Sequence, residues 1–272
     1  MNIRKINFLW PIITFFCIGV ASLAYAKNEN STVNALTYEV IAERSHKTSL
    51  FTQGLLIKNN HFFESSGLYN KSILVTYPIA EPDNSWAKLS APFTAKRALP
   101  DNYFAEGLAL LHNKLYLLTW QEKTLFVYDA TTLNFLTQLH YSGDGWGLTT
   151  DGTHLIRSDG SDQLFFHNPE NFSHIKSISV KLNHKPVTQI NELEFAEGFI
   201  WANIWHDNHI MKIDPKTGNV VGILDASDIV KSLHLNDSES VLNGIAYDSD
   251  KKVFWLTGKS WPKMFSIKIA NQ

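Results

Sequence analysis

Phe51-Thr52-Gln53-Gly54-Leu55 is the stretch that decides the fold, because variants of it return along the chain. The variants are Phe104-Ala105-Glu106-Gly107-Leu108, Gly145-Trp146-Gly147-Leu148, Asn191-Glu192-Leu193-Glu194-Phe195 and Leu242-Asn243-Gly244-Ile245-Ala246. Each copy precedes a polar turn and further alternating, strand-like runs. A spacing of about 40 to 50 residues is typical of the four-stranded blades of a β-propeller. The sequence therefore predicts an all-β protein folded as a five-bladed β-propeller.

The segment from Leu36 to Arg44 precedes the first copy and has the alternation of a strand. We expect it to pair with the last blade, beside Phe265 to Ile269, because closing the ring in this way removes exposed strand edges. Two stretches depart from the period. Residues 81–102 contain three prolines and are predicted to form a long connection, and residues 227–241 are predicted to contain a short helix.

The N-terminus has the features of an export signal. A basic start is followed by an apolar run from Phe8 to Val20 and by Ala24-Tyr25-Ala26, which fits a cleavage site. The predicted organisation is a signal peptide (1–26), a flexible N-terminus (27–35) and a single β-propeller domain (36–270). We therefore expect a periplasmic or secreted protein, with no stable membrane association once the signal is removed.

Composition excludes several classes of function. Cys17, the one cysteine in the chain, lies inside the predicted signal, so disulfides, thiol catalysis and cysteine zinc sites are not expected in the mature protein. The 24 basic and 26 acidic residues form no basic stripe, which argues against a nucleic-acid partner. No histidine pattern resembles a metalloenzyme motif, so we expect no metal ligands. We also expect a monomer.

Two columns of the aligned repeats place polar and aromatic side chains at one end of the predicted ring. The first column, where second strands end, contains Trp120, Asp159, Trp205 and Lys259. The second, at the starts of the innermost strands, contains Gln53, Glu106, Trp146, Asn191 and Asn243. Because innermost strands converge on one axis, these side chains are predicted to form one small-molecule pocket with aromatic walls and a few polar groups.

Glu64 is the candidate acid/base. It follows the apolar pair Phe62-Phe63 at the end of a predicted strand, and we expect it to face the same pocket. A carboxyl group that is buried without a partner has a raised pKa, which suits proton transfer.

These residues resemble the plant and bacterial glutaminyl cyclotransferases, also called glutamine cyclotransferases, a family of five-bladed propellers. The likeness extends over about residues 36 to 269. Besides the repeats, it rests on Phe63-Glu64-Ser65-Ser66-Gly67, Leu118-Thr119-Trp120-Gln121, Trp201-Ala202-Asn203-Ile204-Trp205 and Thr257-Gly258-Lys259. The resemblance implies a glutaminyl-peptide cyclotransferase that converts the N-terminal glutamine of a peptide or protein into pyroglutamate and releases ammonia. It implies no required cofactor and no catalytic metal, while a structural calcium ion on the axis stays open.

The resemblance also implies roles for individual residues. Glu64 would be the acid/base, so that Glu64→Gln would abolish turnover without affecting folding, and Lys259 would stabilise the developing negative oxygen or tune Glu64. The polar group that would hold the substrate comprises Gln53, Glu106 and Asn191. The indoles of Trp120, Trp146 and Trp205 would form the walls and exclude water.

Two other functions fit the same architecture. A non-catalytic propeller that binds a sugar or peptide would have a similar aromatic pocket, although it would not need Glu64 and Lys259. A calcium-dependent hydrolase of the lactonase type would need several oxygen ligands on the axis, which Glu106, Asn191 and Asn243 would supply in part.

Overall fold

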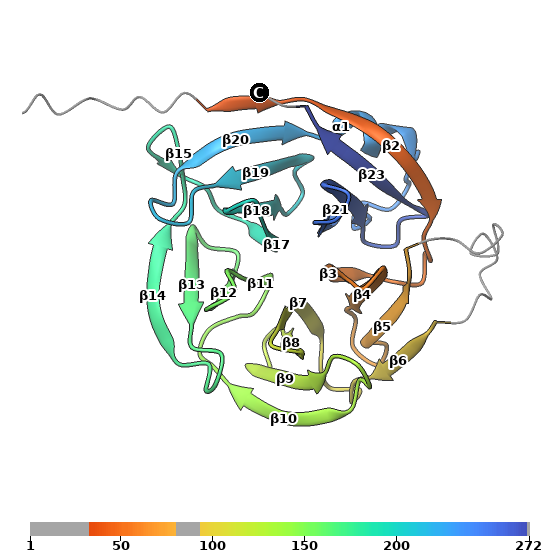
Figure 1. The fold of residues 1–272 in the computed structure, drawn as a ribbon, viewed down its shortest axis with the longest axis vertical. Coiled ribbons are helices and arrows are strands. Elements are labelled where there is room, and N and C mark those ends of the chain that lie inside the picture. Colours follow the sequence, from red (N-terminus) through yellow and green to blue (C-terminus); the bar gives the residue numbers. More distant parts are fainter. Residues whose placement is uncertain (1–32, 80–92, 271–272) are drawn as a thin grey trace, which may run out of the picture. The chain divides into compact units, whose positions relative to one another are not determined.

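The computed structural model describes residues 33–79 and 93–270, and this part of the chain forms an all-β ring of five blades (Figure 1). Blade 1 comprises β3 (Thr52–Lys58), β4 (His61–Ser66), β5 (Ile73–Pro78) and β6 (Ala95–Ala98). Blade 2 comprises β7 (Ala105–Leu111), β8 (Lys114–Thr119), β9 (Thr124–Asp129) and β10 (Phe135–His140). Blade 3 comprises β11 (Leu148–Thr150), β12 (Leu155–Arg157), β13 (Gln163–His167) and β14 (His174–Ser179).

Blade 4 comprises β17 (Ile190–Ala196), β18 (Phe199–Ile204), β19 (His209–Ile213) and β20 (Val220–Asp225). Blade 5 comprises β21 (Leu242–Asp248), β22 (Val253–Gly258), β23 (Lys263–Ile269) and, from the N-terminal part of the chain, β2 (Tyr38–Ser45). A small hairpin, β15 (Lys181–Leu182) and β16 (Lys185–Pro186), separates blades 3 and 4. The five-bladed all-β fold predicted from the repeats is confirmed.

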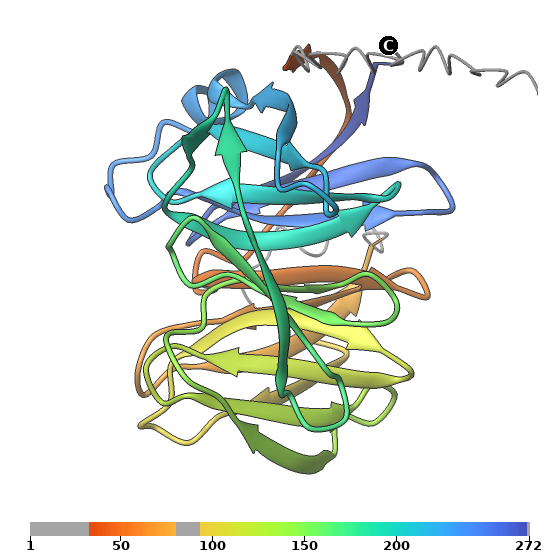
Figure 2. The same cartoon turned by 90° about the vertical axis from the view of Figure 1, so that its left-hand side faces the viewer.

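The ring closes through the N-terminal strands. Strand β2 pairs antiparallel with β23, from Tyr38 opposite Ile269 to Ser45 opposite Lys263, so the predicted closure of the last blade is confirmed. The strand before it, β1 (Asn34–Leu36), pairs in parallel with β20 of blade 4. Figures 1 and 2 both show these N-terminal strands on the outer rim, beside the end of β23. The N-terminal segment thus joins blade 4 to blade 5.

Two predicted boundaries are wrong. Asn34 and Ala35, expected in a flexible N-terminus, belong to β1, because the outer edge of β20 offers unpaired backbone groups to a further strand. The predicted long connection over residues 81–102 contains β6, the outermost strand of blade 1, which pairs with β5. The helix predicted within residues 227–241 is present as α1 (Ser227–Ser232). The predicted signal peptide lies outside the described residues.

The glycines of the repeated motif let the innermost strands approach one another. A Cβ atom on Gly107 would lie 2.2 Å from the backbone nitrogen of Leu148, and one on Gly147 would lie 2.0 Å from the carbonyl oxygen of Asn191. Blade 4 has Glu192 at the equivalent place. Its buried carboxylate crosses to the inner strands of blades 1 and 5 and accepts hydrogen bonds from the backbone of Leu55 (3.3 Å) and Ile245 (2.9 Å).

Aromatic side chains fill the layers between neighbouring blades. Trp201 of blade 4 packs on Phe254 of blade 5, with 4.6 Å between ring centroids, and Trp255 of blade 5 packs edge-on against Phe62 of blade 1 at 5.4 Å. Both tryptophans thus occupy sheet interfaces. Nowhere in residues 33–79 and 93–270 is there a helix with the length and apolarity needed to cross a bilayer.

Candidate active site

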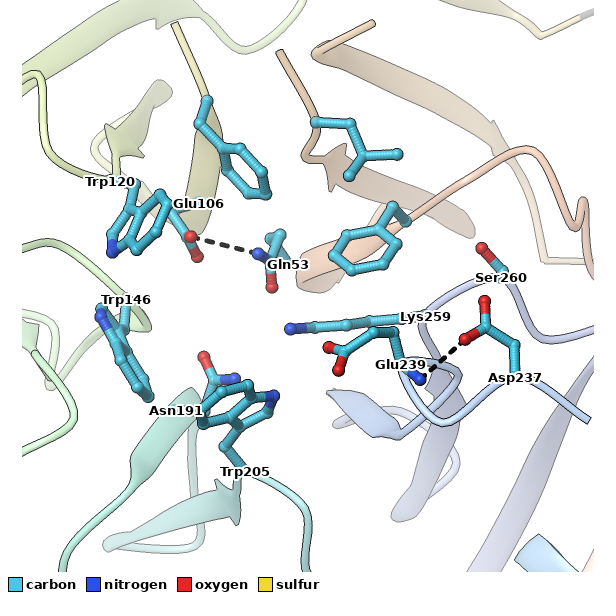
Figure 3. A pocket seen from close by; sticks show the side chains of 13 residues that line it. Gln53, Glu106, Trp120, Trp146, Asn191, Trp205, Asp237, Glu239, Lys259 and Ser260 are labelled. Atoms are coloured by element: carbon cyan, nitrogen blue, oxygen red, sulfur yellow. Dashed lines mark hydrogen bonds between the residues drawn. The ribbon is translucent and has the colours of Figure 1, made fainter. Parts of the chain in front are cut away.

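A cavity of about 540 Å³ opens at one end of the ring (Figure 3). Its lining combines five aromatic side chains with seven polar or charged ones, and apolar walls with converging polar groups are the usual character of a site for a small ligand. The residues that line it are Phe51, Gln53, Leu68, Phe104, Glu106, Trp120, Trp146, Asn191, Trp205, Asp237, Glu239, Lys259 and Ser260.

The predicted columns supply most of this lining. The structure brings together Gln53, Glu106, Trp120, Trp146, Asn191, Trp205 and Lys259, which come from all five blades. They meet because the innermost strands begin, and the second strands end, at the same end of the ring. Two members of the columns do not line the cavity. The Asp159 carboxylate instead accepts hydrogen bonds from the backbone and hydroxyl groups of Ser161, and Asn243 is fully buried outside the lining.

Aromatic rings line the cavity in two groups, Trp146 with Trp205 and Trp120 with Phe104. The indoles of Trp146 and Trp205 meet edge to face with centroids 5.8 Å apart, and Trp120 meets Phe104 in the same manner at 5.7 Å. Trp146 depends on a glycine behind it. Gly160 has a positive φ of 82°, and a Cβ atom on it would lie 2.7 Å from the indole. The neighbouring Asp159-Gly160 turn therefore leaves room for the ring.

Glu106 is the buried carboxyl group of the cavity, whereas Asp237 and Glu239, which also line it, are exposed. The residue is 5 % exposed, and its Oε1 accepts a hydrogen bond of 3.1 Å from Nε2 of Gln53 (Figure 3). Burial raises the pKa of Glu106 well above its ordinary value; the positive charge of Lys259 opposes this shift, and the nearby carboxylates of Glu122 and Asp144 add to it. A raised pKa makes the ionised carboxylate a stronger proton acceptor than an exposed glutamate, which suits a role in proton transfer.

Lys259 extends its ammonium group toward the middle of the cavity (Figure 3). The nitrogen lies 4.9 Å from the centre of the Phe51 ring, in cation–π geometry. Burial lowers the pKa of Lys259, while the negative charges of Glu106 and Glu239 act in the opposite direction. A cation and a carboxyl group with opposed pKa shifts thus share one desolvated cavity, an arrangement that is frequent at catalytic sites.

Comparison with known proteins gives the family. The glutamine cyclotransferase family model matches residues 13–269. The chain belongs to the glutamine cyclotransferase family. It is 37 % identical over 237 residues to the glutaminyl-peptide cyclotransferase of Arabidopsis thaliana, covering 86 % of this chain and 71 % of that protein. It also matches the crystal structure of Myxococcus xanthus glutaminyl cyclase with a TM-score of 0.80 and 39 % identity, covering 88 % of this chain and 98 % of that one.

The prediction that Glu64 faces the pocket of this glutamine cyclotransferase is wrong. Glu64 is fully buried and does not line the cavity. Strand pairing aligns the first two blades. Ser66 pairs with Thr52 at the start of blade 1, and Thr119 pairs with Ala105 at the same place in blade 2. Glu64, two residues before Ser66, is therefore equivalent to the core residue Leu117. Glu64 therefore lies within β4, whereas Leu68, beyond the end of that strand, lines the cavity.

Glu64 instead belongs to an ion pair between blades 1 and 5. Its carboxylate accepts hydrogen bonds from Thr52 Oγ1 (2.6 Å), Tyr77 OH (2.5 Å) and His46 Nε2 (3.1 Å). The other ring nitrogen of His46 donates to the carbonyl oxygen of Trp261 (2.8 Å), and an imidazole that donates from both nitrogens is a cation. Burial acts to raise the pKa of Glu64, but the His46 charge and these hydrogen bonds outweigh it, so the pKa is lowered. A low pKa is the reverse of what proton transfer at neutral pH requires.

Several lining residues were not predicted from the sequence. Phe51 and Phe104 stand two positions before Gln53 and Glu106 in the repeated motif, so their shared place was a usable signal. Asp237 and Glu239 come from the stretch after α1 that interrupts the repeat period. Loops that depart from a repeat often form the rim of a site, which was the available signal for these two acids.

Metal ligands are not gathered at this site. Over residues 33–79 and 93–270, no group of three or more His, Cys, Asp or Glu side chains is placed to hold a metal ion. Of the three side chains that a calcium site on the axis would use, Glu106 and Asn191 line the cavity and Asn243 does not. Activity without a metal stays a prediction.

Proposed function

We propose that this protein converts an N-terminal glutaminyl residue into pyroglutamate with release of ammonia, and that Glu106 carries the protons. The observation that supports this best is a buried carboxyl group with a raised pKa, facing an aromatic cavity beside a lysine. Family membership supports the reaction class, since the relatives described above are glutaminyl cyclases.

The proposed reaction is intramolecular. The Glu106 carboxylate removes a proton from the substrate α-ammonium, and the resulting amine attacks the side-chain amide carbon to form a C–N bond. The carbonyl electrons move to oxygen and give a tetrahedral intermediate. When they return, the C–N bond to the original amide nitrogen breaks, and Glu106 delivers its proton to that nitrogen, which leaves as ammonia. The ring nitrogen, which carries two hydrogens and a positive charge after the attack, then loses one proton to the regenerated Glu106 carboxylate, and this proton leaves with ammonia as ammonium. Because both reacting groups belong to one residue, holding the side chain folded back supplies much of the rate enhancement.

Lys259 and Asn191 are placed to support this chemistry. The Lys259 ammonium points into the cavity, as does the Asn191 amide from the opposite side (Figure 3). Either group can donate a hydrogen bond to the developing negative oxygen, and such donors act most strongly in a site from which water is excluded. We assign Lys259 as the main stabiliser because it carries a full charge.

Gln53 and the indoles have positioning roles in this proposal. Gln53 holds Glu106 through the hydrogen bond from its Nε2. Trp120, Trp146 and Trp205 cover the apolar part of the substrate side chain and keep water from the amide, which limits hydrolysis to glutamate.

Three further features belong to the same proposal. We propose that the reaction needs neither a cofactor nor a metal, that a peptide or protein N-terminus is the substrate, and that the protein works as a monomer after export. The sequence supports export through its basic and apolar N-terminal segment with a small-residue cleavage motif.

The test is direct. The mature protein is incubated with a dipeptide that begins with glutamine, and mass spectrometry follows the loss of one ammonia, with a dipeptide that begins with asparagine as the control. We expect product with the wild type and almost none with Glu106→Gln. If the wild type gives no product at any pH from mildly acidic to alkaline, this protein shares the fold of the family but not the proposed activity.

A further inference from the structure

Asn243 is the blade 5 member of the second column, which comprises the residues at the starts of the innermost strands. The four equivalent residues, Gln53, Glu106, Trp146 and Asn191, all line the site. Asn243 is fully buried and reaches neither the cavity nor the surface. Its role must therefore act through its neighbours.

The contacts of Asn243 lead to Glu106. Its Nδ2 donates hydrogen bonds to the backbone oxygen of Thr52 (2.8 Å) and to Oε1 of Gln53 (3.2 Å). The Gln53 amide then donates from Nε2 to Oε1 of Glu106 (3.1 Å). The three side chains form a directed chain of hydrogen bonds that runs from blade 5 through blade 1 to blade 2.

The direction of this chain is fixed at its start. Both partners of Asn243 Nδ2 are oxygen acceptors, so only the nitrogen of the Asn243 amide can face them. Because Asn243 holds the Gln53 oxygen, the Gln53 nitrogen must face Glu106. The Oδ1 of Asn243 has no hydrogen-bond partner among residues 33–79 and 93–270. A buried acceptor without a partner is costly. The two hydrogen bonds donated by Nδ2 are therefore the reason for an asparagine at this position.

The backbone holds Asn243 in this place. Strand β21 has a bulge between Leu242 and Ile245, and Gly244 within it has a positive φ of 125°. The backbone nitrogen of Gly244 donates to Oδ1 of Asn203 in the neighbouring blade (2.9 Å). The Asn243 side chain leaves this bulge toward Gln53, whereas Asn203 bonds to the backbone of the bulge at Gly244.

We propose that Asn243 is a positioning residue of the reaction, which keeps the Gln53 N–H directed at the Glu106 carboxylate. This inference rests on the proposed function. If the Gln53 amide turned over, its oxygen would face the carboxylate and disfavour the ionised form that takes the proton from the substrate. Asn243 thus acts on the availability of the base and not on substrate binding.

The test uses Asn243→Leu, which keeps the size of the side chain and removes the donor. We expect the acidic limb of the kcat/KM profile to move to higher pH by about one unit, and kcat/KM below that limb to fall about tenfold, with KM little changed. Adding Asn243→Leu to a Gln53→Leu variant should move the limb no further, because the intermediate amide is already absent. Asn243→Ser serves as a second variant if the leucine does not fold.

The matched control is Asn203→Ala. It removes one hydrogen bond to the same bulge, which stays paired with β22, and leaves Asn243 and its two hydrogen bonds in place, so it should lower the melting temperature while the pH profile stays at the wild-type position. A second readout does not need turnover: ¹³C NMR of glutamate-labelled protein, with Glu106→Gln to assign the signal, gives the Glu106 pKa directly. If the wild type turns over but both Asn243 variants keep the wild-type limb and Glu106 pKa, the inference is wrong. If the wild type has no activity, the proposed function fails instead.

Discussion

Glu64→Gln and Glu106→Gln make the same chemical change at two buried carboxyl groups, and we expect opposite results. Glu106 has a raised pKa because burial favours its neutral form, so a neutral amide is tolerated there. Its Oε1 can still accept the hydrogen bond from Gln53. Glu106→Gln should therefore leave the melting temperature within a few degrees of the wild type. Loss of the proton acceptor should lower kcat by about 10²- to 10⁴-fold.

Glu64→Gln should instead destabilise the protein. The substitution removes the negative charge that faces the His46 imidazolium, and removing one partner of a buried pair costs about 3–5 kcal/mol. For a domain of this size, each kcal/mol lowers the melting temperature by about 2–4 °C, so a decrease of about 6–20 °C is expected. The cavity itself keeps its full lining, so the folded fraction should turn over at close to the wild-type rate.

The pH dependence of this decrease gives a further check. The Glu64 pKa is lowered in the folded protein, so its contribution to stability is present above the unfolded pKa of about 4.3 and is lost as the pH falls through the folded value. The melting temperatures of wild type and Glu64→Gln should therefore converge as the pH falls below the unfolded value and through the lowered folded pKa of Glu64.

The assay combines thermal unfolding with ammonia release from a dipeptide that begins with glutamine, measured at low temperature so that Glu64→Gln stays folded. A Glu64→Gln variant that keeps its melting temperature but loses turnover would place Glu64, and not Glu106, in the reaction. A Glu106→Gln variant with wild-type kcat would show that the Glu106 carboxyl group has no part in proton transfer.

Four other perturbations have defined outcomes. Lys259→Met should lower kcat by about 10²- to 10³-fold with a smaller change in KM, because the charge acts on the developing negative oxygen. A raised KM with an unchanged kcat would instead assign Lys259 to substrate binding. Gly160→Ala should lower kcat/KM about tenfold or more by displacing the Trp146 indole, which a change in tryptophan fluorescence should accompany; an unchanged spectrum and rate would contradict the packing. Burial raises the pKa of Glu194 to about 8, so its stability contribution declines as the pH rises from about 4.5 to that value. Glu194→Gln retains an oxygen for the Tyr247 N–H and should raise the melting temperature above pH 8 but not below pH 4.5; a pH-independent difference would exclude titration of Glu194 as its cause. Prolonged dialysis against a chelator should leave turnover unchanged, whereas a loss reversed only by added zinc or calcium would disprove metal independence.

The sequence determined the ring and the side chains at its mouth. Repeated glycines such as Gly107 and Gly147 fix how closely innermost strands approach, and that requirement is visible in the motif itself. Since every blade starts its inner strand at the same end, equal positions in the repeat converge, and the column of Gln53, Glu106 and Asn191 could be aligned from the sequence alone.

Tertiary structure alone decided which glutamate faces the cavity. Glu64 and Glu106 both follow apolar residues near a strand end, so local pattern does not separate them. The pairing of Ser66 with Thr52 puts Glu64 inside the strand, on the layer between blades, where His46 supplies the opposite charge. His46 becomes its neighbour only when the N-terminal strand β2 closes the ring on blade 5. The pKa of a carboxyl group depends on what surrounds it in space, and here the opposite charge is brought against Glu64 by the pairing that closes the ring, which local sequence pattern does not reveal.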